Sequence, residues 1–236
     1  MTPAELAARI DHTILKPEAS SPEVHRAATE AMQHAFASVC VAPVWVGRVV
    51  TMVRDFQPPT RVCTVVGFPH GTNKSTLKAI EATSTIKEGA DEIDVVPHLP
   101  PLLKGDAQTV KAELLEIVRA ARATNREVVI KVILETALLL KALGPKDGEA
   151  ALAAGCRAAR ESGCDFVKTS TGFHPAGGAT AEAVALLKKH ADGLQVKAAG
   201  GIRDLATAQS MLDAGADRLG MSNSVAVLEE LNSSMR

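Results

Sequence analysis

Short apolar runs rich in β-branched residues alternate with longer amphipathic segments along the whole chain. Several runs are apolar at consecutive positions, as in VCTVVGF and VVIKVIL, which is typical of parallel strands covered on both faces. Runs of this kind, bounded by turn residues, predict strands. The predicted strands are Ile10–Ile14, Ala37–Val41, Val62–Phe68, Glu92–Val96, Val128–Leu134, Phe166–Thr171, Gln195–Ala199 and Arg218–Met221.

Helical patterns lie between these strands. Ser21, Pro22 and Glu23 supply a cap, a proline suited to the first turn and a first-turn acid at the start of one helix. Most of the patterns end close to a glycine, which can adopt the left-handed conformation that terminates a helix. The predicted helices are Glu23–His34, Lys74–Glu88, Asp106–Thr124, Asp147–Ser162, Ala179–His190 and Asp204–Asp213.

The alternation of strands and helices predicts an α/β protein with a parallel sheet. Eight such units in 236 residues match the size of a (β/α)8 TIM barrel, about 250 residues. A helix-to-strand junction recurs as EGADEIDVV, SGCDFVKTS and AGADRLGMS, at a spacing too irregular for a solenoid. We therefore expect one domain, residues 1–236, in which Ser233–Arg236 form a mobile tail. An open, doubly wound sheet is the alternative.

Composition narrows the class of function. The formal net charge is -1, and five Phe, one Trp and no Tyr are too few for a nucleic-acid stacking surface. We therefore expect no nucleic-acid partner. The start of the chain has no signal-peptide pattern, and no apolar run reaches the roughly 18 residues of a membrane span. Four cysteines without metal-type spacing indicate reduced core thiols in a cytoplasmic protein that does not bind membranes.

Ionisable residues inside predicted strands carry the candidate chemistry. They are Asp94, Lys131, Lys168 and Lys197, each on a different strand. If all four point inward they must meet, because a barrel of this size is filled by its own side chains. Burial and a neighbouring ammonium both lower the pKa of a lysine, which is a known route to a Schiff-base nucleophile. An aspartate beside it can move protons, so the set indicates carbonyl chemistry through an imine.

Glycine-rich segments after the later strands indicate a phosphate site. AAGGIRD and LGMSNS each place glycines before a helix, where backbone amides and the helix N-terminus favour an anion. STGFHPAGG can close a third side of such a site, and loops after the seventh and eighth strands commonly bind phosphate in barrels. Arg203 can either reach the phosphate or cap a loop. His12, His70, His98 and His174 show no HxH or HExxH spacing, so we interpret them as surface or loop residues and expect no metal.

Several segments together resemble the deoxyribose-phosphate aldolase family. They are IDHTILKP, FASVCVAPVWV, VCTVVGFPHGTNKSTLKAIEA, GADEIDVV, VVIKVILET, GCDFVKTSTGF and VKAAGGIRD, in order from about residue 10 to residue 222. The resemblance implies a (β/α)8 barrel and a class I lyase that needs neither metal nor cofactor. The implied reaction is reversible cleavage of 2-deoxy-D-ribose 5-phosphate into D-glyceraldehyde 3-phosphate and acetaldehyde. It also implies a homodimer.

The resemblance also implies residue roles. Lys168 matches the Schiff-base lysine, Lys197 the lysine that lowers its pKa and exchanges protons, and Asp94 the acid/base residue. Pocket positions match Asp11, Thr13, Cys40, Lys131 and Thr171, and phosphate-binding positions match Gly172, Gly200, Gly201, Gly220 and Ser222.

The chain departs from the family pattern at two places. Prolines at 97, 100 and 101 stiffen the segment after Asp94, which we expect to be a loop poor in amide donors. The chain also lacks the C-terminal tyrosine of some members. Three other functions stay open: an imine aldolase for another small phosphorylated substrate, a non-catalytic sugar-phosphate-binding protein, and a metal-dependent lyase using the histidines.

Overall fold

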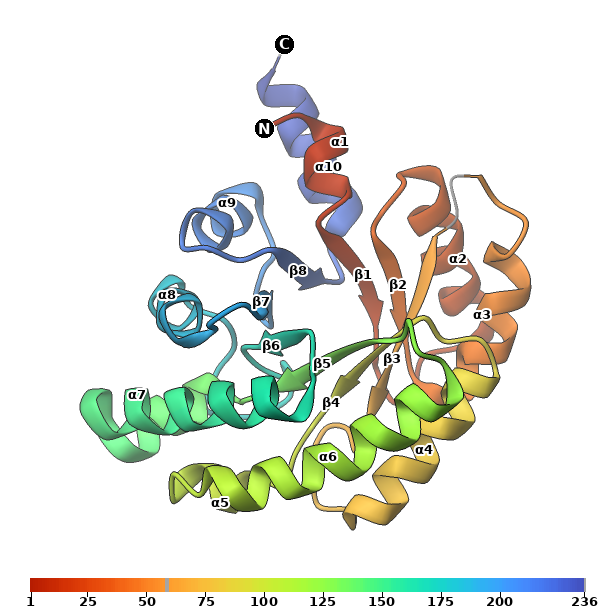
Figure 1. The fold of residues 1–236 in the computed structure, drawn as a ribbon. Helices are drawn as coiled ribbons and strands as arrows, with labels where there is room; N and C mark the ends of the chain where they lie inside the picture. The colour runs from red at the N-terminus through yellow and green to blue at the C-terminus, as the bar shows by residue number, and fades with distance from the viewer. Residues whose placement is uncertain (58–59, 236) are drawn as a thin grey trace.

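A closed barrel of parallel strands forms the centre of the molecule in the computed structural model, which describes residues 1–57 and 60–235. Neighbouring strands follow chain order, and β8 pairs with β1 to close the barrel (Figure 1). The closure confirms the (β/α)8 prediction and excludes the open sheet. The strands are β1 Ile10–Ile14, β2 Ser38–Val41, β3 Arg61–Val66, β4 Glu92–Val95, β5 Val129–Ile133, β6 Phe166–Lys168, β7 Gln195–Ala199 and β8 Arg218–Met221.

Helices surround the barrel, and the two chain ends lie close together, where α1 packs against α10 (Figure 1). The apolar core fills the space between strands and helices. Among the described residues, no helix is long and apolar enough to cross a membrane. The helices are α1 Pro3–Ala7, α2 Ser21–Gln33, the 3-10 turn η1 Pro43–Trp45, α3 Val46–Val53, α4 Ser75–Lys87, α5 Leu99–Leu103, α6 Ala107–Thr124, α7 Thr136–Ser162, α8 Ala181–His190, α9 Leu205–Asp213 and α10 Ser224–Ser234.

The predicted helices are confirmed to within two residues, except that α7 begins well before the predicted Asp147. Its two halves meet at a kink, because Gly144 has a φ of 78° and Pro145 follows it. The sequence patterns did not predict α1, α3 or α5. In α3 the sequence VGRVVTMV is so apolar and β-branched that periodicity alone does not separate it from a buried strand.

The proline-rich segment 97–101 was predicted to be a loop, which is confirmed for Pro97 and wrong from Leu99 onward. It enters α5, where Pro100 and Pro101 lie in the first turn. The first turn of a helix has no partner for its backbone N–H groups, so proline costs little there. At the other end of the chain, Ser233 and Ser234 belong to α10, and Arg236 of the predicted tail lies outside the described residues.

Strands β3 and β6 are shorter than predicted because their last residues turn into the loops at the carboxyl end of the barrel. Gly67 leaves β3 with a φ of 66°. After Lys168, Thr169 still hydrogen-bonds to the backbone of β7, but Ser170, Thr171 and Gly172 lead away from the sheet. The STG segment is therefore free to line the barrel mouth.

The recurring junction seen in the sequence sets the register between strands. Asp91, Asp165 and Asp217 each precede a strand and accept a hydrogen bond from a backbone N–H of the preceding strand. The distances from Val62, Ile130 and Val196 N to the carboxylates are 2.8, 2.7 and 2.8 Å. Each aspartate thus fastens the start of its strand to its neighbour, which explains why the motif repeats in a barrel.

Candidate active site

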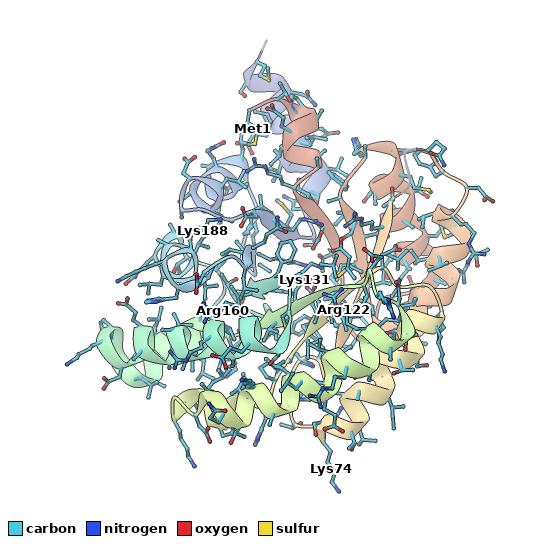
Figure 2. The ribbon with its side chains drawn as sticks, in the orientation of Figure 1. Met1, Lys74, Arg122, Lys131, Arg160 and Lys188 are labelled. Carbon is cyan, nitrogen blue, oxygen red and sulfur yellow. The ribbon has the colours of Figure 1, made fainter. Side chains whose placement is uncertain are left out.

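The four ionisable residues predicted from the strands meet inside the barrel, where they project from β4, β5, β6 and β7. Asp94 Oδ2 accepts hydrogen bonds from Lys168 Nζ and Lys197 Nζ, each at 2.7 Å. Asp94 Oδ1 accepts a third, from Lys131 Nζ at 2.9 Å. All four side chains are buried, and Figure 2 shows Lys131 among the strands while other labelled lysines lie on outer helices. One carboxylate therefore holds three amines together.

Further charged residues complete this group, and sequence reasoning did not single them out for it. Lys131 also contacts Glu92 at 2.6 Å, and Lys197 contacts Asp11 at 2.6 Å. Arg218 contacts Asp11 at 2.6 Å. We call Asp11, Glu92, Asp94, Lys131, Lys168, Lys197 and Arg218 the charged cluster. Glu92 lies two positions before Asp94, and Arg218 two before Gly220, so strand periodicity contained the signal for both.

The cluster keeps its own charges ionised. Burial by itself opposes ionisation of Asp94, but the nearby ammonium groups outweigh it and hold the pKa of Asp94 well below its usual range. The pKa of Asp11 is lowered in the same way, chiefly by Lys197. Burial opposes protonation of Lys131 and Lys197, yet the carboxylates raise the pKa of both lysines. Lys197 therefore stays an ammonium ion beside Lys168.

Cations exceed anions in the charged cluster. Four cations face three carboxylates, and of the four only Lys168 has a single carboxylate partner, Asp94. Lys168 also shares that partner with Lys131 and Lys197. Lys168 is therefore the cation that makes the fewest ion pairs within the cluster.

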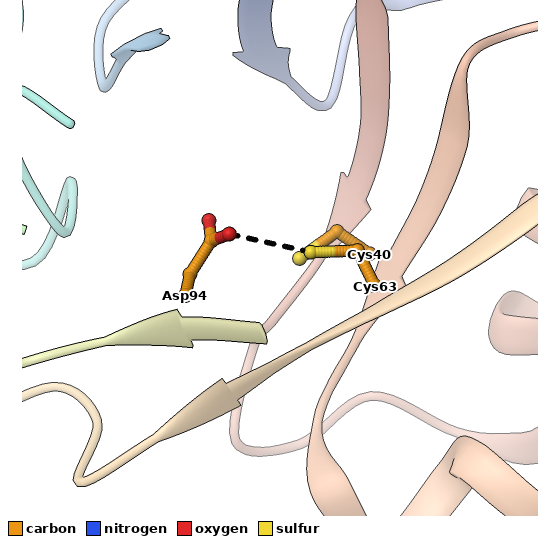
Figure 3. Close-up of side chains that lie close together, drawn as sticks. All are labelled: Cys40, Cys63 and Asp94. Atoms are coloured by element: carbon orange, nitrogen blue, oxygen red, sulfur yellow. Dashed lines mark hydrogen bonds between the residues drawn. The ribbon is translucent and has the colours of Figure 1, made fainter. Parts of the chain in front are cut away.

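A pair of thiols lies on the other side of Asp94. Cys40 and Cys63 face each other across β2 and β3, and Cys63 Sγ lies 3.4 Å from Asp94 Oδ1 (Figure 3). Lys131 Nζ donates to the same sulfur at 3.3 Å. Cys63 was not predicted to belong to the site. It orients the Asp94 oxygen that faces away from Lys168.

A pocket of about 570 Å³ opens above the charged cluster. Lys168 is the cluster member that lines it, together with the predicted residues Thr13 and Thr171. Asp11, Cys40 and Lys131 were predicted to line the pocket, and this placement is corrected: they are fully buried beneath it. They lie in deeper positions of their strands, where their side chains pack inside the barrel rather than at its mouth.

The five residues matched to phosphate binding all line one side of this pocket: Gly172, Gly200, Gly201, Gly220 and Ser222. We call this set the glycine wall. Four of its members stand before α9 or α10, and Asn223 Nδ2 ties the two segments together by donating to the Arg203 carbonyl at 2.7 Å. Arg203 lines the pocket as well. The wall therefore combines backbone amides, two helix N-termini and one guanidinium, a suitable setting for an anion.

Close backbone packing requires glycine in this wall. Gly200 has a φ of 94°, and a Cβ there would lie 2.7 Å from Ser170 Oγ and 3.1 Å from the Cα atoms of Gly172 and Gly178. Gly201 has a φ of 83° but open space around it. Position 200 thus excludes a side chain by contact, and position 201 disfavours one by conformation.

Glu135 is a buried residue that the sequence did not reveal as part of the site. It follows β5 with a φ of 51°, a left-handed conformation that is rare for a residue with a side chain. Its carboxylate accepts a hydrogen bond from Thr171 Oγ1 at 2.8 Å and faces the Thr171 backbone N–H. Burial raises the pKa of Glu135. Its position directly after a predicted strand was the available signal.

The histidines were interpreted as surface or loop residues, and for His12 this was wrong. His12 belongs to β1 and is buried. Its ring tolerates burial because both nitrogens are hydrogen-bonded, to Glu30 of α2 and Ser224 of α10. The two partners lie 18 and 212 positions away in the chain, so no local motif could show them.

Two groups of possible metal ligands occur inside the barrel, and neither suits a cation. Cys40, Cys63 and Asp94 form one group, and Asp11, Cys63 and Glu92 form the other. Lys131 Nζ lies within 3.3 Å of Cys63, Asp94 and Glu92, and Lys197 Nζ lies within 2.7 Å of Asp11 and Asp94. The ammonium groups therefore occupy the space beside these ligand atoms where a metal ion would have to lie.

The whole barrel, with its inward lysines, matches a known family. Residues 6–227 match the DeoC/LacD family of aldolases. The chain belongs to this aldolase family. Deoxyribose-phosphate aldolase from Caldanaerobacter subterraneus is 44% identical over 226 residues, 95% of this chain and 93% of the relative. The protein of the same name from Mycobacterium avium is 47% identical over 98% of this chain and all of the relative.

Solved structures agree with this aldolase assignment. A structure described as a unique tetrameric deoxyribose phosphate aldolase from Aeropyrum pernix has a TM-score of 0.87 and 34% identity. The match covers 99% of this chain and 93% of that one. The resemblance in the sequence to deoxyribose-phosphate aldolases is thereby confirmed, and with it the assignment of this aldolase to the lyases.

Proposed function

We propose that this aldolase catalyses the reversible cleavage of 2-deoxy-D-ribose 5-phosphate to D-glyceraldehyde 3-phosphate and acetaldehyde through a Schiff base on Lys168. The observation that carries the proposal is the position of Lys168. It is the amine of the charged cluster that lines the pocket, and it shares Asp94 Oδ2 with Lys197, whose pKa the neighbouring carboxylates raise. A neutral Lys168 amine is the nucleophile that imine formation needs.

The bond changes follow from this arrangement. The Lys168 amine adds to the C1 carbonyl of the open-chain sugar, and loss of water gives an iminium ion. A proton leaves the C3 hydroxyl, the C2–C3 bond breaks, and its electrons form an enamine with the iminium group. D-Glyceraldehyde 3-phosphate departs. Protonation at C2 and addition of water then release acetaldehyde and restore the amine.

Asp94 and Lys197 share the proton transfers in this scheme. Asp94 contacts the attacking amine directly and, by way of a water molecule, can accept the C3 hydroxyl proton and return a proton to C2. Because neighbouring cations hold the pKa of Asp94 low, the carboxylate passes protons on and does not retain them. Lys131, Asp11 and Glu92 keep it in place and supply compensating charge.

The substrate phosphate is assigned to the glycine wall, with Thr13 and Thr171 beside the sugar chain. This orientation is supported by the pocket lining, which includes Lys168, Thr171 and Gly172, and by the close approach of Gly172 to Gly200, whose Cα would lie 3.5 Å from a Cβ at position 172. The proposed reaction needs no metal. This part of the proposal is supported by the lysine ammonium groups that contact the buried carboxylates and so take the place of a cation.

The assembly and cellular location also belong to the proposal. We infer a homodimer, supported by exposed apolar side chains on α4, Leu77 and Ile80, at 54% and 64% exposure. Sedimentation velocity would distinguish a dimer from a tetramer such as that described for the Aeropyrum pernix aldolase. A cytoplasmic location is supported by four buried free thiols.

Borohydride trapping tests the mechanism. Acetaldehyde and then borohydride should leave an ethyl group on Lys168, located by mass spectrometry of the digested protein. Lys168→Met should abolish both the adduct and cleavage, whereas Lys78→Met serves as a control. Lys78 is another fully buried lysine, paired with Glu113 at 2.6 Å, outside the charged cluster. An adduct on Lys131 or Lys197, or cleavage that survives in Lys168→Met, would refute the assignment.

A further inference from the structure

A chain of hydrogen bonds, partly exposed at Glu30 and buried at His12 and Ser224, leads from α2 through β1 to the glycine wall. Glu30 Oε2 lies 2.8 Å from His12 Nε2, and His12 Nδ1 lies 2.9 Å from Ser224 Oγ. Ser224 Oγ also lies 3.1 Å from the Met221 carbonyl, so with His12 Nε2–H directed at the Glu30 carboxylate the single Ser224 hydroxyl proton is shared between His12 Nδ1 and this carbonyl. His12 and Ser224 are 4% and 0% exposed. Burying a polar side chain costs free energy unless it is hydrogen-bonded, so these bonds stabilise His12 and Ser224 in their buried positions.

The last acceptor of this chain lies within the proposed phosphate site. Met221 stands between Gly220 and Ser222, two members of the glycine wall. Ser224 is the first residue of α10 and follows the wall residue Ser222 by two positions. The bond from Ser224 to Met221 therefore determines the course of the backbone that carries both wall residues. His12 determines the position of Ser224.

We propose that His12, through Ser224, is a positioning residue for phosphate recognition. His12 lines the pocket beside Glu30, but its ring nitrogens are engaged by Ser224 and Glu30, so it holds the β8–α10 segment and does not contact the reacting atoms. The inference rests on the proposed function for the identity of the substrate. The anion-binding role of the segment itself can be tested with inorganic phosphate alone.

The packing of the His12 ring can be tested apart from its hydrogen bonds, because the ring also contacts Phe36. The His12 and Phe36 rings lie 5.3 Å apart, so an aromatic replacement retains this contact. His12→Phe removes both hydrogen bonds and keeps a ring, and Ser224→Ala removes only the hydroxyl link. His190→Phe is the matched control, because His190 Nε2 bonds to Glu149 at the same 2.8 Å but lies away from the pocket.

The experiment compares a phosphorylated substrate, its unphosphorylated counterpart and the free anion. In His12→Phe and Ser224→Ala, KM for deoxyribose 5-phosphate and Kd for inorganic phosphate should rise about tenfold, the effect of roughly one buried hydrogen bond. The kcat should change less than about twofold, and kcat/KM for unphosphorylated deoxyribose should stay within the same limit. His190→Phe should match the parent protein in every assay.

Three outcomes decide the matter. Unchanged phosphate affinity in folded His12→Phe and Ser224→Ala would overturn the inference. So would an equal loss with both sugars, since that is the signature of general structural damage. If the parent protein binds phosphate but cleaves neither sugar, the proposed function fails, and the inference is then judged by the phosphate titration of the same variants.

Discussion

The charged cluster and the glycine wall form two parts of one pocket and are built from opposite kinds of residue. The cluster consists of charged side chains from strands, all buried except the partly buried Arg218, and held by ion pairs of which the shortest are 2.6–2.9 Å. The wall consists mostly of residues without side chains, placed where loops turn into helices. Covalent chemistry needs a nucleophile of defined protonation state, which burial and nearby charges set. Anion binding needs converging backbone amides, which only close packing can supply.

The two regions should therefore respond differently to substitution. In the cluster, removing one carboxylate leaves several buried ammonium ions without compensation, so activity and stability fall together. In the wall, adding a methyl group displaces the backbone, so binding of the phosphate suffers more than the chemistry.

Asp94→Asn should have the largest effect. It removes the carboxylate shared by Lys131, Lys168 and Lys197, so turnover should fall by about 10²–10⁴-fold and the free energy of unfolding by about 3–5 kcal/mol. Steady-state kinetics and urea unfolding measure the two quantities. Glu161→Gln is the control, because Glu161 pairs with Lys111 at 2.7 Å on a partly exposed surface. Equal losses in both variants would remove the distinction between the cluster and an ordinary ion pair.

Gly200→Ala and Gly201→Ala should separate contact from conformation in the wall. Both need a left-handed backbone, which costs about 1–2 kcal/mol for alanine, and Gly200→Ala adds about 1–3 kcal/mol for overpacking. Gly200→Ala should therefore raise KM for deoxyribose 5-phosphate more than Gly201→Ala does, with cleavage of unphosphorylated deoxyribose nearly unchanged. A larger effect at position 201 would contradict the packing argument.

The stability of the protein should depend on pH at both extremes. The pKa values of Asp11 and Asp94 are lowered by folding, so their contribution is present above about pH 4 and is lost as pH falls below that value. The pKa values of Lys131 and Lys197 are raised, so their contribution is present below about pH 10 and is lost as pH rises. Each side should cost about 1–3 kcal/mol in urea unfolding.

Asp94→Asn provides the comparison for this pH dependence. It should flatten the acidic side of the profile, because one of the two lowered carboxylates is gone. A parent protein whose stability is constant from about pH 5 to about pH 2 would show that the cluster does not hold its charges as described.

Removal of metal ions should have the smallest effect. Lysine ammonium groups already hold the positions from which the cysteines and carboxylates of the barrel would bind a cation. Activity after dialysis against a chelator should therefore stay within about twofold of the untreated protein, a change of less than about 0.5 kcal/mol. A large loss that added metal restores would refute the metal-independent mechanism.

The sequence by itself determined the barrel, the positions of the strands and the four central ionisable residues. Parallel strands buried on both faces are apolar at nearly every position, so Asp94, Lys131, Lys168 and Lys197 were conspicuous in their runs. The glycines before α9 and α10 were equally visible, because few other residues permit a tight turn there. These features depend on residues that are neighbours in the chain, so the sequence alone shows them.

Only the tertiary structure decided which of these residues reach the pocket and what supports them. Closure of the barrel brings Arg218 of β8 to Asp11 of β1 and buries Asp11 below the mouth. It also brings Ser224 to His12, across 212 positions, and so converts an apparent loop histidine into a buried link to the glycine wall. Burial and charge compensation depend on neighbours in space, and in a closed barrel the first and last strands are neighbours.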